Sequence, residues 1–194
     1  VGSFFDGYID DVAIYNKILT ASEVSDIYGG AFPASGLVGK WTLEGDTGTL
    51  VAFICNHCPF VIHINATLVK LANDYQKKGI NFIAISSNDV EHYPQDGPDL
   101  MKMHANKLNY AFPYLYDETQ NVAKAYDAAC TPDFFLFDKD RSLVYRGQMD
   151  DSRPGNGIVN DGQDLKHAMN CLVKTTQVNF HHGWPMGVCL QELS

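Results

Sequence analysis

At residues 53–60 the chain reads Phe53-Ile54-Cys55-Asn56-His57-Cys58-Pro59-Phe60. The apolar run 50–54 is typical of a buried strand, and apolar residues then recur near helical spacing from Pro59 until Gly79. Proline suits the first position of a helix, because its missing N–H would have no helical partner there. The sequence therefore predicts that Cys58 is the N-cap of a helix and that Cys55 lies in the loop before it.

This placement favours redox chemistry at the two cysteines. The N-terminus of a helix stabilises a thiolate through its N–H groups and the positive end of its dipole. Cys55, three residues before Cys58, is within reach of a disulfide, and a protonated His57 would stabilise a neighbouring thiolate further. Two alternatives remain: buried structural cysteines, or half of a zinc site whose other ligands would be His181, His182 and Cys189.

A second motif is Cys130-Thr131-Pro132-Asp133, which directly precedes an expected strand at 134–137. A proline at the first residue of a strand is compatible with a cis peptide bond and with a bare backbone edge. Most X-Pro bonds are trans, so this motif is a weak indication by itself, whereas the two motifs together are specific.

The order of elements after residue 49 indicates an α/β fold with a mixed central sheet flanked by helices. Further strands are expected at 81–87, 111–116 and 142–146, and further helices at 99–108, 120–126 and 163–173. Asp138 to Arg141 reads as the turn of a hairpin. The loop 150–157 is rich in turn residues, and we expect its Arg153 to pair with a carboxylate, with substrate contact as the alternative.

Composition excludes several classes of function. The 194 residues include 14 Lys and Arg against 23 Asp and Glu, for a net charge of -9, and no basic run stands out. We therefore expect no nucleic-acid partner. No apolar stretch approaches the roughly 20 residues of a membrane span, so we expect no membrane partner.

Residues 49 to about 178 resemble the thioredoxin superfamily, and closely a peroxiredoxin-like branch related to alkyl hydroperoxide reductase and thiol-specific antioxidant proteins. The resemblance lies in four stretches: 53–60, 113–120, 130–135 and 150–156. It implies a thioredoxin-like fold in which Thr131-Pro132 is the cis-proline element facing the active-site thiols. We predict one domain at 49–178 and a C-terminal tail at 179–194.

The resemblance also assigns roles to the two cysteines. In thioredoxin-like proteins the nucleophile lies five residues after the last strand Phe, and counting from Phe53 gives Cys58. Cys55 is then the resolving thiol, although the mirror assignment, with Cys55 attacking, stays open. Peroxiredoxins carry a Thr where this chain has Cys55, and an Arg where it has Thr131-Pro132, and these groups activate the peroxide.

The preferred function is therefore a thiol-disulfide oxidoreductase, in which Cys58, Cys55, His57, Thr131 and Pro132 form the site. The first alternative is a peroxiredoxin-like thiol peroxidase, an antioxidant enzyme in which Cys55 or Cys130 captures a sulfenic acid on Cys58. Expected partners are protein or small-molecule thiols and disulfides, or peroxides, with no metal or organic cofactor. Cys130 and Cys171 are otherwise expected to be buried core residues.

Residues 1–48 have a different sequence pattern from the alternating strands and helices that follow residue 49. An alternating pattern at 7–16 predicts a half-buried strand, and a capping box of Thr20 and Glu23 predicts a short helix that ends at Gly29. This segment resembles the closing strand and helix of a laminin-G-like, concanavalin-like jelly roll, and 36–45 resembles the opening strand of another repeat. We predict a β-rich remnant or junction. A second alternative function follows: a non-catalytic binding protein with a thioredoxin-like scaffold.

Overall fold

The structure is a computed structural model that describes residues 12–15, 19–28, 31, 33–35, 37–41, 47–174 and 188–189. The chain divides into two compact units, one formed by Tyr8–Glu44 and the other by Gly45–Ser194 together with Val1–Gly7. Among the described residues, no helix is long and apolar enough to cross a membrane.

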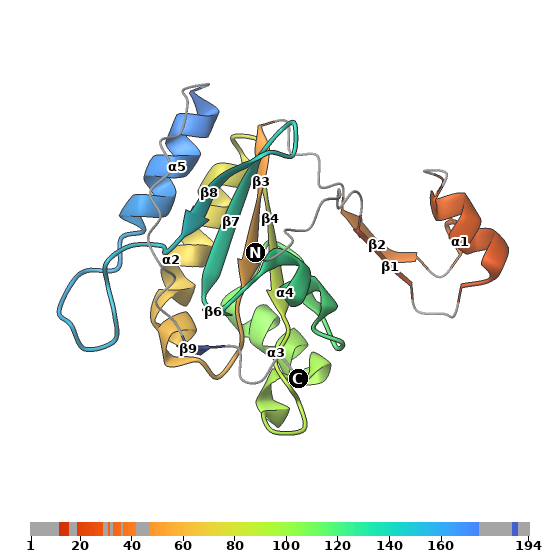
Figure 1. The fold of residues 1–194 in the computed structure, drawn as a ribbon, viewed down its shortest axis with the longest axis horizontal. Coiled ribbons are helices and arrows are strands. Elements are labelled where there is room, and N and C mark those ends of the chain that lie inside the picture. The colour runs from red at the N-terminus through yellow and green to blue at the C-terminus, as the bar shows by residue number, and fades with distance from the viewer. Residues whose placement is uncertain are drawn as a thin grey trace. The chain divides into compact units, whose positions relative to one another are not determined.

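The smaller unit consists of an antiparallel strand pair and a short helix (Figure 1). Strand β1 (Val12–Tyr15) pairs with β2 (Leu37–Trp41), and α1 spans Ala21–Tyr28. The Thr20 hydroxyl accepts a hydrogen bond from Glu23 N–H, and the Glu23 carboxylate accepts one from Thr20 N–H. This reciprocal pair confirms the capping box that the sequence predicts.

The larger unit is built on a five-stranded mixed sheet with the order β5-β4-β3-β7-β8. Strands β3 (Gly48–Phe53), β4 (Ile80–Ser86) and β5 (Tyr114–Tyr116) are parallel, whereas β7 (Asp133–Asp138) and β8 (Leu143–Gly147) run antiparallel to their neighbours. The mixed sheet with helices on its faces confirms the predicted thioredoxin-like class.

Side chains of the central strands alternate between the two faces of the sheet, as the period of a strand requires. Leu50, Ala52, Phe134 and Leu136 pack in one cluster with the buried side chains of α2 (Pro59–Gln76) and α5 (Gln163–Val173). On the opposite face, Tyr126 of α4 (Asn121–Tyr126) makes edge contacts with Phe53, Phe135 and Phe137. The core is therefore divided into two layers by the sheet.

Helix α2 begins and ends as the sequence predicts. Cys58 is its N-cap, with an extended backbone, and Pro59 is its first residue. Gly79 follows the helix with a φ of 83°, in the left-handed region that favours glycine. The predicted helix at 59–78 is confirmed to within two residues at its C-terminal end.

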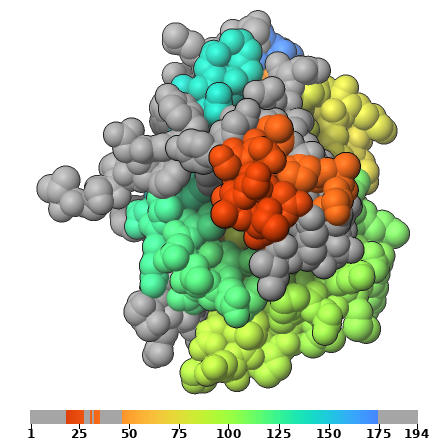
Figure 2. All heavy atoms as spheres, turned by 90° about the vertical axis from the view of Figure 1, so that its right-hand side faces the viewer, coloured from red at the N-terminus to blue at the C-terminus, as the bar shows by residue number. Residues whose placement is uncertain are grey.

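Three short elements near α2 are absent from the sequence prediction. The 3-10 helix η1 (Pro94–Asp96) precedes α3 (Pro98–Leu108), and the pair β6 (Cys130–Thr131) and β9 (Val188–Cys189) forms a separate two-stranded sheet. Figure 1 shows β9 beside β6, near the first turn of α2. In Figure 2, α3 (yellow-green) and the residues around α4 (green) form neighbouring parts of one surface.

Candidate redox site

The predicted cysteines lie at the carboxyl end of β3, where the chain turns into α2. Their side chains are almost completely buried, with exposures of 1% for Cys55 and 0% for Cys58. Thr131 contacts both of them from a different part of the chain. Its hydroxyl lies 3.5 Å from Cys55 Sγ, and its main-chain oxygen accepts a hydrogen bond from the Cys58 thiol at 3.3 Å.

The Thr131–Pro132 peptide bond is cis, which confirms the sequence prediction. Thr131 ends β6, and Asp133 begins β7 directly after the proline. Because β7 pairs with β3 along its whole length, the backbone before β7 is held next to the loop that follows β3. Sheet pairing therefore brings the two motifs together across 73 residues of sequence.

His57 contacts a residue that the sequence argument does not include. Its Nδ1 lies 2.5 Å from Oδ2 of Asp96, a side chain with 0% exposure at the end of η1. The ring also stacks on Tyr93, with 4.6 Å between the ring centroids. The imidazole is therefore fixed in position by a buried carboxylate and an aromatic ring, and any positive charge on it is paired with Asp96.

Asp96 also holds the backbone of the cysteine loop. Its Oδ1 accepts hydrogen bonds from the N–H of Asn56 at 2.7 Å and of His57 at 3.3 Å, and its Oδ2 accepts one from Nδ2 of Asn88. One sequence signal could have identified it: loops that follow adjacent parallel strands meet at the same edge of the sheet. Asp96 lies in the loop after β4, beside the loop after β3.

Burial and its neighbours keep Cys55 protonated. The pKa of its thiol is raised well above the ordinary range by the hydrogen bond to Cys58, by burial and by the negative charge of Asp96, with the Thr131 hydroxyl acting in the opposite direction. Cys58, by contrast, occupies the N-cap of α2, where the helix dipole favours negative charge. The Cys58 thiol donates to the Thr131 main-chain oxygen, so the helix dipole acts on the thiolate that forms when Cys58 loses this proton.

One group of side chains in this region has the composition of a metal site. Ligand atoms of Cys55, His57 and Asp96 lie within 4.8 Å of one another. The 2.5 Å between His57 and Asp96 fits a shared proton, whereas two ligands of one zinc ion lie about 3 Å apart when each bond is about 2.0 Å. The pair is thus held by a hydrogen bond. His181 and His182, the other ligands considered for zinc, lie outside the described residues.

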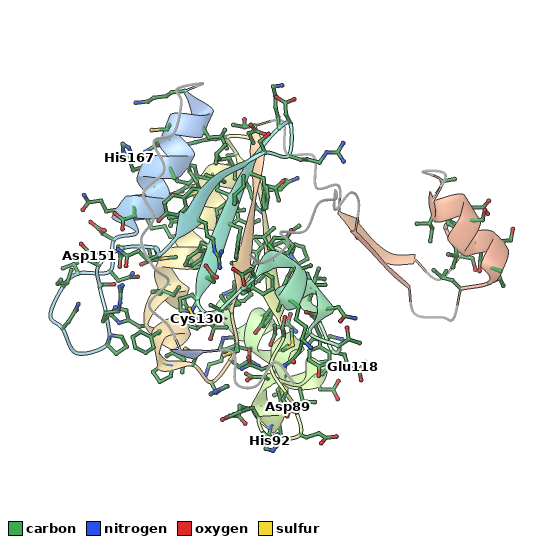
Figure 3. The ribbon with its side chains drawn as sticks, in the orientation of Figure 1. Asp89, His92, Glu118, Cys130, Asp151 and His167 are labelled. Carbon is green, nitrogen blue, oxygen red and sulfur yellow. The ribbon has the colours of Figure 1, made fainter. Side chains whose placement is uncertain are left out.

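The remaining cysteines occupy different environments. Cys130 is buried in β6, and the antiparallel register places it opposite Cys189 of β9; Figure 3 labels it near that strand pair. Cys171 is only partly buried, and its Sγ lies 3.6 Å from Nε2 of His167 on the surface of α5. The prediction that Cys171 belongs to the core is wrong, because the apolar face of α5 is supplied by Leu165, Ala168 and Met169.

The prediction for Arg153 is also wrong. Its guanidinium donates to the main-chain oxygens of Asp150 and Ser152 and to Oε1 of Gln148, all of them neutral acceptors. The carboxylate of Asp150 is instead occupied by other donors in the same loop, including the N–H groups of Ser152 and Gly162. Arg153 lines a pocket that Pro132 also lines.

Two solved structures are similar to this chain in both sequence and fold. An uncharacterized conserved protein from Geobacillus kaustophilus is 50% identical, with a TM-score of 0.77, over 83% of this chain and 86% of that one. A hypothetical protein from Sinorhizobium meliloti 1021 is 42% identical, with a TM-score of 0.76, over 79% of this chain and 85% of that one. A search of curated proteins found no match.

A more distant structure, a thioredoxin-like protein solved in its oxidized form, is 20% identical with a TM-score of 0.55, over 70% of this chain and 83% of that one. At this identity the likeness concerns the fold alone. A profile of the AhpC/TSA family matches residues 29–146, so it begins inside the segment 1–48. The laminin-G-like resemblance of that segment stays a prediction. The chain belongs to the AhpC/TSA family.

Proposed function

We propose that this protein is a thiol-disulfide oxidoreductase in which Cys58 attacks, Cys55 resolves and Thr131-Pro132 docks the partner. The observation that carries the proposal is the position of Thr131, which contacts the sulfur atoms of both cysteines through two different oxygen atoms. Cys58 caps a helix, which suits an attacking thiolate, and Cys55 has a raised pKa, which suits a thiol that reacts second. Dithiol exchange needs one thiol in each of these two roles.

The reaction runs in two displacements. The Cys58 thiolate attacks one sulfur of a substrate disulfide, forming a mixed disulfide and releasing the first thiol of the substrate as its thiolate, which takes a proton from solvent. Cys55 then loses its proton and attacks Cys58 Sγ, so that the Cys55–Cys58 disulfide forms and the second substrate thiol leaves. Two thiols of the protein are oxidised as one disulfide is reduced, and the reverse sequence oxidises a dithiol substrate.

The order of attack follows from the surroundings of each sulfur. The helix N-terminus stabilises a thiolate on Cys58, whereas the charge of Asp96 disfavours one on Cys55. Once Cys58 is part of a mixed disulfide, its sulfur is neutral. A negative charge on Cys58 then no longer opposes ionisation of the Cys55 thiol. The mirror assignment would require a thiolate beside the buried carboxylate, which is the less favourable arrangement.

Docking of a partner involves the C-terminal segment of the chain. An extended substrate that adds to the Cys130–Thr131 edge would pair with the same backbone groups that β9 pairs with. The two sulfur atoms are also buried. We therefore propose that a protein partner replaces β9 on this edge before it reaches Cys58.

The proposal is tested with disulfide reduction by the reduced protein, in single turnover and after removal of excess reductant. Cys58→Ser abolishes the reaction. Cys55→Ser stops it at the mixed disulfide, whose mass identifies Cys58 as the attacked position. Cys171→Ser is the matched control, because its thiol is partly exposed and lies on α5, and it leaves the rate unchanged. Trapping on Cys55 in the Cys58→Ser variant would overturn the assignment.

Membership of the AhpC/TSA family favours a second candidate, a thiol peroxidase. The Cys58 thiolate would attack hydrogen peroxide, giving a sulfenic acid and hydroxide, and Cys55 would condense with it to release water and form the disulfide. Peroxide consumption driven by a dithiol, measured beside the disulfide assay, separates the two functions. If neither activity occurs, the chain is a thioredoxin-like scaffold for binding.

A further inference from the structure

A pocket lies between the cis-proline element, the first turns of α2 and the loop 148–153. It is a shallow depression, whose empty space counted together with the solvent at its mouth is about 290 Å³. Phe60, two residues after Cys58, lines it from α2, and Pro132 lines it next to the residue that contacts both thiols. With Ile64 and Met149 these side chains form an apolar wall, and the opposite wall is polar. A group bound in this pocket therefore lies against the cis-proline element, whose Thr131 contacts both thiols.

The polar wall contains a positive charge without a contacting counter-ion. Within the described part of the chain, Arg153 donates only to neutral oxygen atoms, and its buried Nε has no hydrogen-bond partner. A buried donor without an acceptor destabilises the folded protein, because it has lost its hydrogen bonds to water. An acceptor supplied by a ligand would recover that cost, and an anionic acceptor would gain the charge interaction as well.

The neighbouring carboxylates are occupied elsewhere. Asp150 accepts five hydrogen bonds: from the backbone N–H groups of residues 152, 161 and 162, from the Ser152 hydroxyl and from the Asn160 amide. These hydrogen bonds outweigh burial and lower the pKa of Asp150, which stays charged and holds the loop. Gln148 separates Arg153 from two other carboxylates, because its Oε1 binds Arg153 and its Nε2 binds Asp151 and Asp164.

We propose that this pocket binds the carboxylate of an acidic disulfide substrate, with Arg153 as the anion-binding residue. The apolar wall takes the carbon chain between the carboxylate and the sulfur, and the substrate sulfur is then presented to Cys58. Arginine suits this role because its guanidinium forms charge-assisted hydrogen bonds of defined direction with a carboxylate. The inference rests on the proposed disulfide exchange and adds its substrate class, since the net charge of -9 alone would favour cationic substrates.

Three symmetric disulfides of similar size test the proposal: dithiodipropionate, which is anionic, bis(2-hydroxyethyl) disulfide, which is neutral, and cystamine, which is cationic. Reduced protein is mixed with each, quenched with acid, and the oxidised fraction is read by mass. Each rate is divided by the rate of the same disulfide with dithiothreitol, which removes intrinsic reactivity. We expect the anionic disulfide to react about 10-fold faster than the cationic one, equivalent to about 1.4 kcal/mol.

Variants separate the pocket from general charge. Arg153→Gln removes the preference for the anionic disulfide over the cationic one, and circular dichroism with a thermal melt reports whether the variant is folded. Arg153→Lys retains part of the preference. Arg141→Gln, in the turn between β7 and β8, removes the same charge elsewhere and leaves the preference intact. Equal normalised rates for the three disulfides, or a preference that survives Arg153→Gln, overturn the inference. Absence of reaction with all three contradicts the proposed function instead.

Discussion

The Asp96 carboxylate binds the imidazole of His57 at 2.5 Å and, with its second oxygen, the backbone of the same cysteine loop. Asp96 belongs to the loop after β4, so this contact ties together the loops that follow two parallel strands. It gives the site a rigid support on the side opposite Thr131-Pro132, which contacts the thiols from the start of β7.

Replacement of Asp96 by Asn tests this support. In the variant an amide N–H2 would take the place of Oδ2 and would face Nδ1 of His57 and Nδ2 of Asn88. Buried donors would then face each other without an acceptor between them. We expect the free energy of unfolding to fall by about 3 kcal/mol, and disulfide exchange to slow by at least about 10-fold. Chemical denaturation and the single-turnover assay measure the two effects.

Asp89 supplies a matched control for that variant. It also binds a histidine at 2.5 Å, in this case His92, but both side chains are substantially exposed. Figure 3 shows this pair at the bottom of the view. Asp89→Asn should leave the free energy of unfolding close to that of the wild type, because an exposed ion pair contributes little. An equal loss in both variants would mean that burial of Asp96 is unimportant.

The protonation of the cysteine pair is the second prediction. Because the pKa of Cys55 is raised, we predict that Cys58 is the first thiol of the pair to ionise. The ultraviolet absorbance of the thiolate, followed from pH 5 to 9, should lose its lowest-pH step in Cys58→Ser and keep it in Cys55→Ser. Cys171→Ser is the control, because it removes a thiol outside the pair and should leave the lowest-pH step unchanged. Loss of that step in Cys55→Ser would support the mirror assignment.

The third prediction is that the free energy of unfolding depends on pH through Asp133. Burial raises its pKa to about 6, in spite of the Arg146 guanidinium 3.5 Å away. A raised pKa means that the folded protein binds more protons than the unfolded chain between pH 4 and 6, so stability falls as pH rises through this window. Relative to the wild type, Asp133→Asn should gain up to about 3 kcal/mol between pH 4 and 8.

The exposed Asp127, which also contacts Arg146, provides the comparison. Unfolding free energies of Asp127→Asn should follow the wild type in parallel across the same pH range, because its exposed carboxylate is solvated in both states. If the difference between Asp133→Asn and the wild type is flat with pH, the burial of a titrating Asp133 is contradicted.

The C-terminal strand supplies the fourth prediction. Deletion of residues 188–194 removes β9 and frees the Cys130–Thr131 edge. A main-chain hydrogen bond contributes about 1 kcal/mol, so we expect kcat/KM for a peptide disulfide to rise roughly 5-fold. Deletion of 190–194 alone leaves β9 in place and is the control. A slower reaction after removal of β9 would indicate that this strand contributes to the site.

Much of the fold follows from local sequence patterns. The apolar run 50–54, Pro59 after Cys58, and Gly79 define a buried strand, a helix start and a helix end, and the structure places each within a few residues of its predicted position. The cis bond before Pro132 agrees with what the family resemblance implies, because the local residues alone only permit it.

The supporting contacts of the site are less predictable, because they depend on how loops distant in sequence meet. The loop after β4 is expected at the same sheet edge as the cysteine loop, but no local pattern singles out Asp96 within it as the partner of His57. Strand β9 consists of two residues whose pairing depends on β6. Arg153 was expected to pair with a carboxylate because charged groups usually do. The loop instead uses its carboxylate for backbone N–H groups and leaves the guanidinium to neutral oxygens.

The central claim is that Cys55 and Cys58 interconvert between dithiol and disulfide. It is tested most directly by equilibrating the native protein in glutathione buffers of graded redox potential, alkylating free thiols and mapping the disulfides by mass spectrometry. We predict one reversible transition in which Cys55 and Cys58 pair with each other, while Cys171 stays a thiol. If both remain reduced at every potential, or pair only with other cysteines, the proposed mechanism is contradicted.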